Sequence, residues 1–205
     1  GALTPDKGLI DKGVRTEFGY FTQNSVELDP DIKVIEYIKK FGEVITLNNG
    51  ASISASKILE KFLFPANIQY GAISKLSGGE KRRLSLLGVL MGNPNFLILD
   101  EPTNDFDLNT LTILEDFLND FNGCIIVVTH DRYLMNRVVD RLLVFDQNGS
   151  ISSFPGNYSD YLEYIQSRND AIKEPEVKIE KKKDLAESKA ENVKKKMSFK
   201  EKKEL

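Results

Sequence analysis

The chain of 205 residues is long enough for one domain, or for one compact domain with an appendage. Its hydrophobic share of 40% is sufficient for a core, and no apolar run approaches the roughly 20 residues of a membrane span, so no membrane segment is expected. Cys124 is the only cysteine, which excludes an intrachain disulfide and is compatible with a reducing cytoplasm. The net charge of −3 conceals an acidic body and a basic tail, because residues 171–205 hold 12 lysines against 8 acidic residues.

The first 93 residues combine a few strand signals with longer helical ones. Between residues 26 and 93 the spacing of apolar residues is mainly helical, whereas from Phe96 onwards strand and helix patterns alternate. We therefore predict an α/β fold in which residues 1–25 and 94–170 form a lobe with a parallel sheet, and residues 26–93 form an inserted helical subdomain. The elements expected before residue 65 are turns at 1–13, a strand at 17–22, a helix at 29–41, a loop at 42–54 and a helix at 55–64.

A glycine pair at residues 78–79 stands at the start of the next predicted helix. Ser77 and Glu80 have the spacing of a capping box, with Ser77 at the N-cap and Glu80 at the third helical position. The glycines let the backbone approach a ligand closely, and the free amides of a helix start favour phosphate. The basic run 81–83 lies one turn further along. The alternative interpretation is an ordinary capped helix without a ligand.

The segment FLILDEPTNDFD, residues 96–107, carries the main chemical signal. Its first four residues form a continuous apolar run, which is typical of a strand buried on both faces of a parallel sheet. Asp100 and Glu101 follow at the strand end, where ligands of open parallel sheets collect. One carboxylate there can hold Mg²⁺ and the other can orient or deprotonate a water molecule. The alternative is an acidic turn that caps the next helix.

The pattern predicts a further strand–helix pair beyond this segment. Asp107 is expected to cap a helix that ends near Phe121, and the buried strand Cys124–Val128 then delivers His130 to the same sheet edge. His130 is the only histidine of the chain, and a lone histidine is often a structural residue; its place after a buried strand favours a catalytic role. The predicted buried side of the helix consists of Leu108, Leu111, Leu114 and Leu118.

The remaining residues are expected to form small elements and a charged tail. Asp131 is predicted to cap a helix, and strands at 141–145 and 150–154 should surround a turn at Asn148-Gly149. A helix at 157–167 is expected to pack through Tyr158, Tyr161 and Tyr164, although aromatic contacts with nucleic acid are an alternative. Residues 171–205 are rich in lysine and glutamate, which is typical of a solvated or partly disordered helix, or of one strand of a coiled coil.

Four motifs occur in the order found in an ATP-binding cassette (ABC) nucleotide-binding domain: LSGGE at 76–80, FLILDE at 96–101, NDFD at 104–107 and TH at 129–130. The chain resembles the ABC-F branch of that family, near the second cassette of its Uup-like members, because of NDFD, GNYSDY at 156–161 and the basic tail. Phe106 replaces the usual leucine. The resemblance implies that Glu101 is the general base and His130 the switch histidine, that ATP is bound by Gln23, Ser77, Gly78, Gly79, Glu80, Asp100 and Asp107, and that Asp100 and Gln23 place Mg²⁺.

The phosphate-binding pattern GxxxxGK[ST] does not occur in this chain. The first residues, GALTPDKG, resemble the segment just after the corresponding helix in family members. We therefore expect a fragment that begins just after that helix, lacks the first strand and phosphate loop, and is inactive on its own. In the intact protein ATP would lie between two cassettes, so the expected partner is a companion cassette of the same chain.

Three classes of function remain open at this point. The resemblance favours a cytoplasmic ABC-F ATPase that couples ATP binding and hydrolysis to the ribosome, with ribosomal RNA as a partner of the basic tail. A nucleotide-binding subunit of an ABC transporter is the second class, against which NDFD and the tail argue. The third is a nonenzymatic docking piece that uses the charged tail to bind nucleic acid.

Overall fold

The computed structural model describes residues 4–22, 28–46, 50–146 and 148–170. The chain divides into two compact units, Gly1–Val138 and Val139–Leu205. Gln23 and the predicted charged tail at 171–205 lie outside the described residues. Within the described part of the chain, no helix has both the length and the apolar character needed to cross a membrane.

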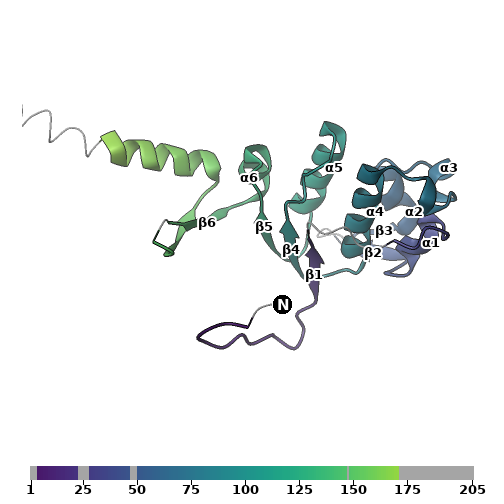
Figure 1. The fold of residues 1–205 in the computed structure, drawn as a ribbon, viewed down its shortest axis with the longest axis horizontal. Helices are drawn as coiled ribbons and strands as arrows, with labels where there is room; N and C mark the ends of the chain where they lie inside the picture. Colours follow the sequence, from purple (N-terminus) through teal and green to yellow (C-terminus); the bar gives the residue numbers. More distant parts are fainter. Residues whose placement is uncertain (1–3, 23–27, 47–49, 147, 171–205) are drawn as a thin grey trace, which may run out of the picture. The chain divides into compact units, whose positions relative to one another are not determined.

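A three-stranded parallel sheet forms the centre of the first unit. It consists of β1 (Phe18–Phe21), β4 (Phe96–Asp100) and β5 (Cys124–Val128), in the order β1-β4-β5. All three arrows point the same way in Figure 1. The strand predicted at 17–22 is thus confirmed, as is the α/β class with a parallel sheet. Because the strands are parallel, the residues that follow β4 and β5 emerge at the same edge.

The two faces of this sheet are covered unequally. Leu97 and Leu99 are fully buried, whereas their neighbours Phe96 and Ile98 are only half-buried. In β5, Ile126 remains 40% exposed and Val128 53% exposed. The prediction that β4 is buried on both faces is therefore wrong, and β5, predicted as a buried strand, is exposed on one face. Side chains alternate along a strand, and among the described residues the core covers one face of the sheet only.

Short helices surround the long helix of the first unit and form most of its core. Gly88 of the long helix allows the short helix that carries Tyr37 to approach closely, because a Cβ atom at residue 88 would lie 3.1 Å from Tyr37 Oη and 3.0 Å from Phe41 Cε2. In Figure 1 these helices gather beside β1. They are α1 (Val34–Lys39), α2 (Ala55–Lys61), α3 (Ala66–Gln69), the 3₁₀ helix η1 (Ile73–Lys75) and α4 (Gly78–Met91).

Two sequence predictions in this region need correction. The expected loop at 42–54 contains an antiparallel hairpin of β2 (Val44–Thr46) and β3 (Ser52–Ser54), too short to give a clear alternation in the sequence. The first helix starts at Val34 rather than near Asp29. Its expected first turn is instead paired with a distant segment, because the amides of Ser74 and Ile73 donate to the carbonyls of Pro30 and Ile32.

The helices that follow β4 and β5 are α5 (Leu108–Asn119) and α6 (Arg132–Val138). Asp107 caps α5 as predicted, with its Oδ1 accepting from the Thr110 amide at 2.7 Å. Leu114 and Leu118 are buried as predicted, but Leu108 is 81% exposed and Thr110 is buried instead. Leu108 is the first helical residue, and the buried side of α5 begins only with Thr110.

The second unit is an antiparallel hairpin followed by a helix. The hairpin comprises β6 (Arg141–Phe145) and β7 (Ile151–Pro155), and Gly149 has a φ of +77°, so the predicted turn is confirmed. The helix at 158–170 packs on β7 through aromatic side chains. The ring of Phe154 lies 5.3 Å from the rings of both Tyr161 and Tyr164.

Candidate functional site

The ends of β4 and β5 bring Glu101 and His130 together. The Glu101 amide donates to the Val128 carbonyl at 2.8 Å, which extends the ladder one residue beyond the strands. Glu101 Oε2 then lies 2.8 Å from His130 Nδ1, an ion pair when the imidazole is protonated. The Glu101 side chain is 15% exposed and that of His130 is 77% exposed. Oε2 is buried and its approach to Nδ1 does not have hydrogen-bond geometry, so the contact between the two side chains is electrostatic.

The backbone at Glu101 adopts an unusual conformation. Its φ of +47° lies in the left-handed region, which costs a residue with a side chain about 1–2 kcal/mol. The Glu101 carbonyl accepts from the guanidinium of Arg82 at 3.1 Å and from the Asn104 amide at 3.4 Å. Asp105 is also left-handed, with a φ of +67°. Contacts with neighbouring segments therefore stabilise the turn after β4 in a conformation that its own sequence disfavours.

The other residues of the strand ends have separate positions. Asp100 is the last residue of β4 and is half-buried. Asp131 caps α6 as predicted, because its Oδ1 accepts from the amides of Tyr133 and Leu134. Among the residues that the structure describes, no group of three or more acidic, histidine or cysteine side chains could hold a metal ion. Asp100 alone still fits Mg²⁺, which usually binds one or two carboxylates together with waters and substrate phosphates.

The start of α4 has the predicted capping box. Glu80 Oε2 accepts from the Ser77 amide at 2.8 Å and from the Ser77 hydroxyl at 2.7 Å, while the Glu80 amide donates to Ser77 Oγ at 3.3 Å. Hydrogen bonds from the Ser77 side chain and then its backbone lower the pKa of Glu80. No atom lies within 4 Å of where a Cβ of Gly78 would be. The start of α4 is therefore open to a ligand at this glycine.

A hollow of about 350 Å³ joins this loop to the start of α5. Arg83 lies beneath it, 8% exposed, and donates to Thr110 Oγ1 at 2.8 Å. The Thr110 amide and then its hydroxyl lower the pKa of Asp107, with a smaller contribution from the Arg83 charge. Burial lowers the pKa of Arg83, and the charges of Asp107 and Glu80 counteract this effect. The lining residues are Ser77, Gly79, Glu80, Arg83, Asp105, Phe106, Asp107 and Thr110.

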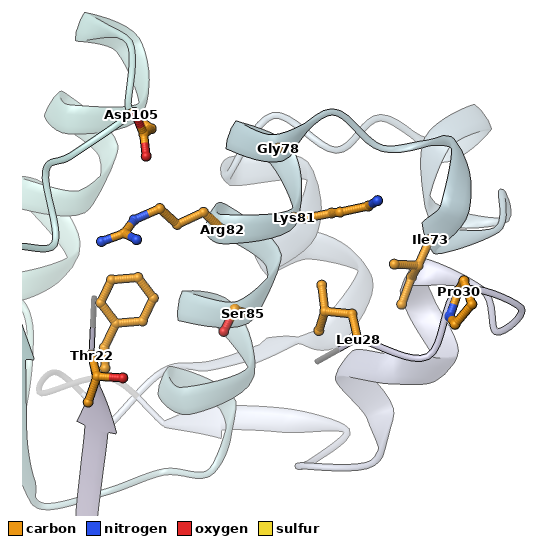
Figure 2. Close-up of a pocket in the computed structure, with 10 residues that line it drawn as sticks. Thr22, Leu28, Pro30, Ile73, Gly78, Lys81, Arg82, Ser85 and Asp105 are labelled. Carbon is orange, nitrogen blue, oxygen red and sulfur yellow. The ribbon is translucent and has the colours of Figure 1, made fainter. Parts of the chain in front are cut away.

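A second cavity, of about 430 Å³, is lined by Lys81 and Arg82 of α4 among other residues (Figure 2). The guanidinium of Arg82 points toward Asp105, while Lys81 points the opposite way (Figure 2). Arg82 also lies over the Phe21 ring, with its Cζ 5.2 Å from the ring centroid. The basic run at 81–83 is visible in the sequence, but the sequence alone predicted no role for Arg82 or Arg83. Three consecutive cationic residues so close to a helix start were the sequence feature that could have indicated a role for these two arginines.

Comparisons with known proteins identify the family. The model of the family described as "ABC transporter" matches residues 1–104. The chain is 49% identical over 98% of its length to the "Uncharacterized ABC transporter ATP-binding protein YfmR" of Bacillus subtilis, and 36% identical over its whole length to "ATP-binding protein Uup" of Escherichia coli. It is 32% identical over 85% of its length to the "Energy-dependent translational throttle protein EttA" of Haemophilus influenzae. The chain spans about a third of the length of these relatives, 31%, 32% and 32% respectively.

A solved structure supports the same fold. The "ATP binding subunit of ABC transporter" superposes with a TM-score of 0.55 at 17% identity, over 73% of this chain and 62% of that one. At this identity the likeness concerns the fold alone. The family match and the identity to the three relatives carry the assignment: the chain belongs to the ABC transporter family, in its ABC-F branch of ATP-binding proteins.

Proposed function

We propose that this chain supplies one half of each of two ATP-hydrolysing sites that form between two cassettes of a longer protein. The observation that carries the proposal is the approach of Glu101 Oε2 to His130 Nδ1, 2.8 Å, at the carboxyl edge of a parallel sheet. Glu101 lies directly after a strand at this edge, and a carboxylate in such a position can take a proton from an attacking water. Family membership supports ATP as the substrate.

In the proposed reaction the two strand ends divide the work. Glu101 acts as general base on the attacking water, and His130, which is largely exposed, contacts the γ-phosphate. Asp100 and Gln23 would hold Mg²⁺, which neutralises phosphate charge when it is bound. Phosphoryl transfer requires positioning and charge stabilisation rather than covalent chemistry by the protein. The turn after β4 is fixed by the hydrogen bonds of Glu101 with Arg82 and Val128, and a fixed turn suits a reaction that depends on positioning.

The loop Ser77–Glu80 and Asp107 serve the nucleotide bound to the companion cassette. Gly78 leaves the helix start open, and amides at a helix N-terminus attract phosphate. The Ser77 hydroxyl donates to Glu80 in the structure, so it would have to rotate toward the γ-phosphate to donate there. Asp107 lines the same hollow as this loop, which supports a shared role. The division into a lobe (1–25 and 94–170) and a helical subdomain (26–93) stays a prediction.

The test uses a chimera in which residues 1–205 replace the matching part of YfmR, with hydrolysis disabled at the other site. Glu101→Gln keeps the shape of the side chain but removes its basicity, so single-turnover hydrolysis should fall about 10²–10⁴-fold while ATP stays bound. Asp100→Asn should instead weaken nucleotide retention, because it removes the proposed Mg²⁺ ligand. Hydrolysis by Glu101→Gln at the parent rate would contradict the assignment of the base.

Residues 1–205 alone should neither bind ATP tightly nor hydrolyse it. The physical reason is that no GxxxxGK[ST] loop is present to hold the β- and γ-phosphates. Calorimetry with Mg-ATP should give no heat of binding at micromolar nucleotide. A dissociation constant in the micromolar range would refute the proposal that phosphate binding depends on a segment outside these residues.

We further propose that the longer protein is cytoplasmic and couples ATP hydrolysis to the ribosome. The name of the relative EttA, a "translational throttle protein", supports this step, as does the net charge of +4 at residues 171–205. If the tail contacts RNA phosphates, the affinity of the chimera for ribosomes should fall steeply with salt, because binding releases counterions. Ribosome binding that keeps its affinity and salt dependence after deletion of the tail would remove the tail from this role.

A further inference from the structure

We propose that Arg82 is a positioning residue for the hydrolytic reaction, and that it acts by holding the main chain of Glu101 against helix α4. This inference rests on the proposed role of Glu101 as the general base. Arg82 is half-buried and lies in the second turn of α4. Its guanidinium donates from Nη2 to the Glu101 carbonyl at 3.1 Å, across 19 residues of sequence.

The need for such a contact arises from the conformation of Glu101. With a φ of +47°, this residue would relax toward a negative φ if nothing held it. Its amide is held by the Val128 carbonyl of β5, so the sheet restrains one side of the peptide. The carbonyl points to α4, where Arg82 provides a charged donor. Charge-assisted hydrogen bonds are about twice as strong as neutral ones.

The Arg82 side chain is itself held in place. Its Cζ lies 5.2 Å from the centroid of the Phe21 ring, the last residue of β1. Figure 2 shows the guanidinium extending from α4 into the space below Asp105. The planar guanidinium of an arginine is pre-organised, so less side-chain entropy is lost for each hydrogen bond that it forms. Arg82 thus connects the end of β1, helix α4 and the turn after β4.

The neighbouring cations differ from Arg82 in their contacts. Arg83 donates to Thr110 of α5, and Lys81 points away from Arg82 (Figure 2). Because α4 begins at the Ser77–Glu80 loop, the Arg82 contact joins that loop to the base through one rigid helix. The position of the Glu101 carboxylate therefore depends on α4. Neither β4 nor the turn after it would fix that position by itself.

The experiment compares three substitutions in the same YfmR chimera. Arg82→Met keeps an unbranched stem over Phe21 but removes the donor, and Arg82→Lys keeps the charge with a single donor group. Lys81→Gln is the matched control, because it removes a charge one residue away. Single-turnover hydrolysis should fall about tenfold or more in Arg82→Met, since small displacements of a catalytic group are costly. Arg82→Lys should recover part of this loss, and Lys81→Gln should keep the parent rate.

The ATP dissociation constant separates positioning from a merely structural role. In Arg82→Met it should stay within about twofold of the parent value while the rate constant falls. A loss of rate that follows a loss of ATP binding in proportion would overturn the inference, as would Arg82→Met hydrolysing at the parent rate while Glu101→Gln is inactive. Parent-rate hydrolysis by Glu101→Gln would overturn the proposed function itself, so the two failures are distinguishable.

Discussion

The two faces of the β1-β4-β5 sheet have nearly the same apolar composition but very different surroundings. On one face Phe21, Leu97 and Leu99 are buried in a core shared with α4 and α5. On the other face Tyr20 is 55% exposed and Ile126 is 40% exposed. An apolar strand pattern therefore indicates that a face can be buried, and the neighbouring elements decide whether it is.

The difference is expected to be largest in the response to side-chain truncation. Leu99→Ala should lower the free energy of unfolding by about 2–5 kcal/mol, because it removes a fully buried leucine and leaves a cavity. Urea denaturation of residues 1–205, followed by circular dichroism, measures this change. Ile98→Ala, one residue earlier and on the half-buried face, is the control and should cost clearly less. Equal costs would mean that the faces are equivalent in solution.

Local patterns predicted part of the site from the sequence. The caps at Ser77 and Asp107 were found because each depends on a partner three residues away, Glu80 or Thr110. That Glu101 and His130 lie at the same edge of the sheet also followed from the parallel strands, since Glu101 is the first residue after β4 and His130 the second after β5. Helix caps and the shared edge of parallel strands can therefore be predicted from the sequence without a structure.

Features that depend on distant segments were missed. The first turn expected near Asp29 is lost to backbone pairing with residues 72–74, which no local pattern announces. The roles of Arg82 and Arg83 depend on partners 19 and 27 residues away. The exposure of one face of β5 could not be predicted either, because the apolar run Cys124–Val128 is compatible with burial of one face or of both.

The cap of α5 should have a smaller effect than the core leucine. Asp107→Ala removes the acceptor for the Thr110 amide, and loss of an N-cap typically costs about 1 kcal/mol. Asp107→Asn keeps a side-chain acceptor and is the matched control, with a smaller loss at neutral pH. A cost for Asp107→Ala as large as that for Leu99→Ala would mean that α5 contributes more to the buried face than its packing indicates.

The same residue gives a pH dependence whose sign is defined. Hydrogen bonds from Thr110 lower the pKa of Asp107 below its ordinary value of 3.8. The folded state therefore binds this proton less readily than the unfolded chain, and the stabilisation present above pH 3.8 is lost as the pH falls toward the lowered value. Asp107→Asn should flatten this part of the stability profile below about pH 4. An unchanged slope would show that the Asp107 carboxylate does not accept the hydrogen bonds from Thr110 in solution.

The smallest expected effect belongs to the exposed face. Ile126→Ala should cost clearly less than Leu99→Ala, about 1 kcal/mol or less, because Ile126 is already 40% exposed and its removal leaves no closed cavity. Both substitutions truncate an aliphatic side chain in the same sheet, so they differ mainly in what covers the side chain. The measurement is the same urea titration at several protein concentrations. A cost for Ile126→Ala that approaches the leucine value and grows with concentration would mean that another chain covers this face in solution. A large cost independent of concentration would place a covering segment within residues 1–205, and the contrast between the two faces would then be wrong.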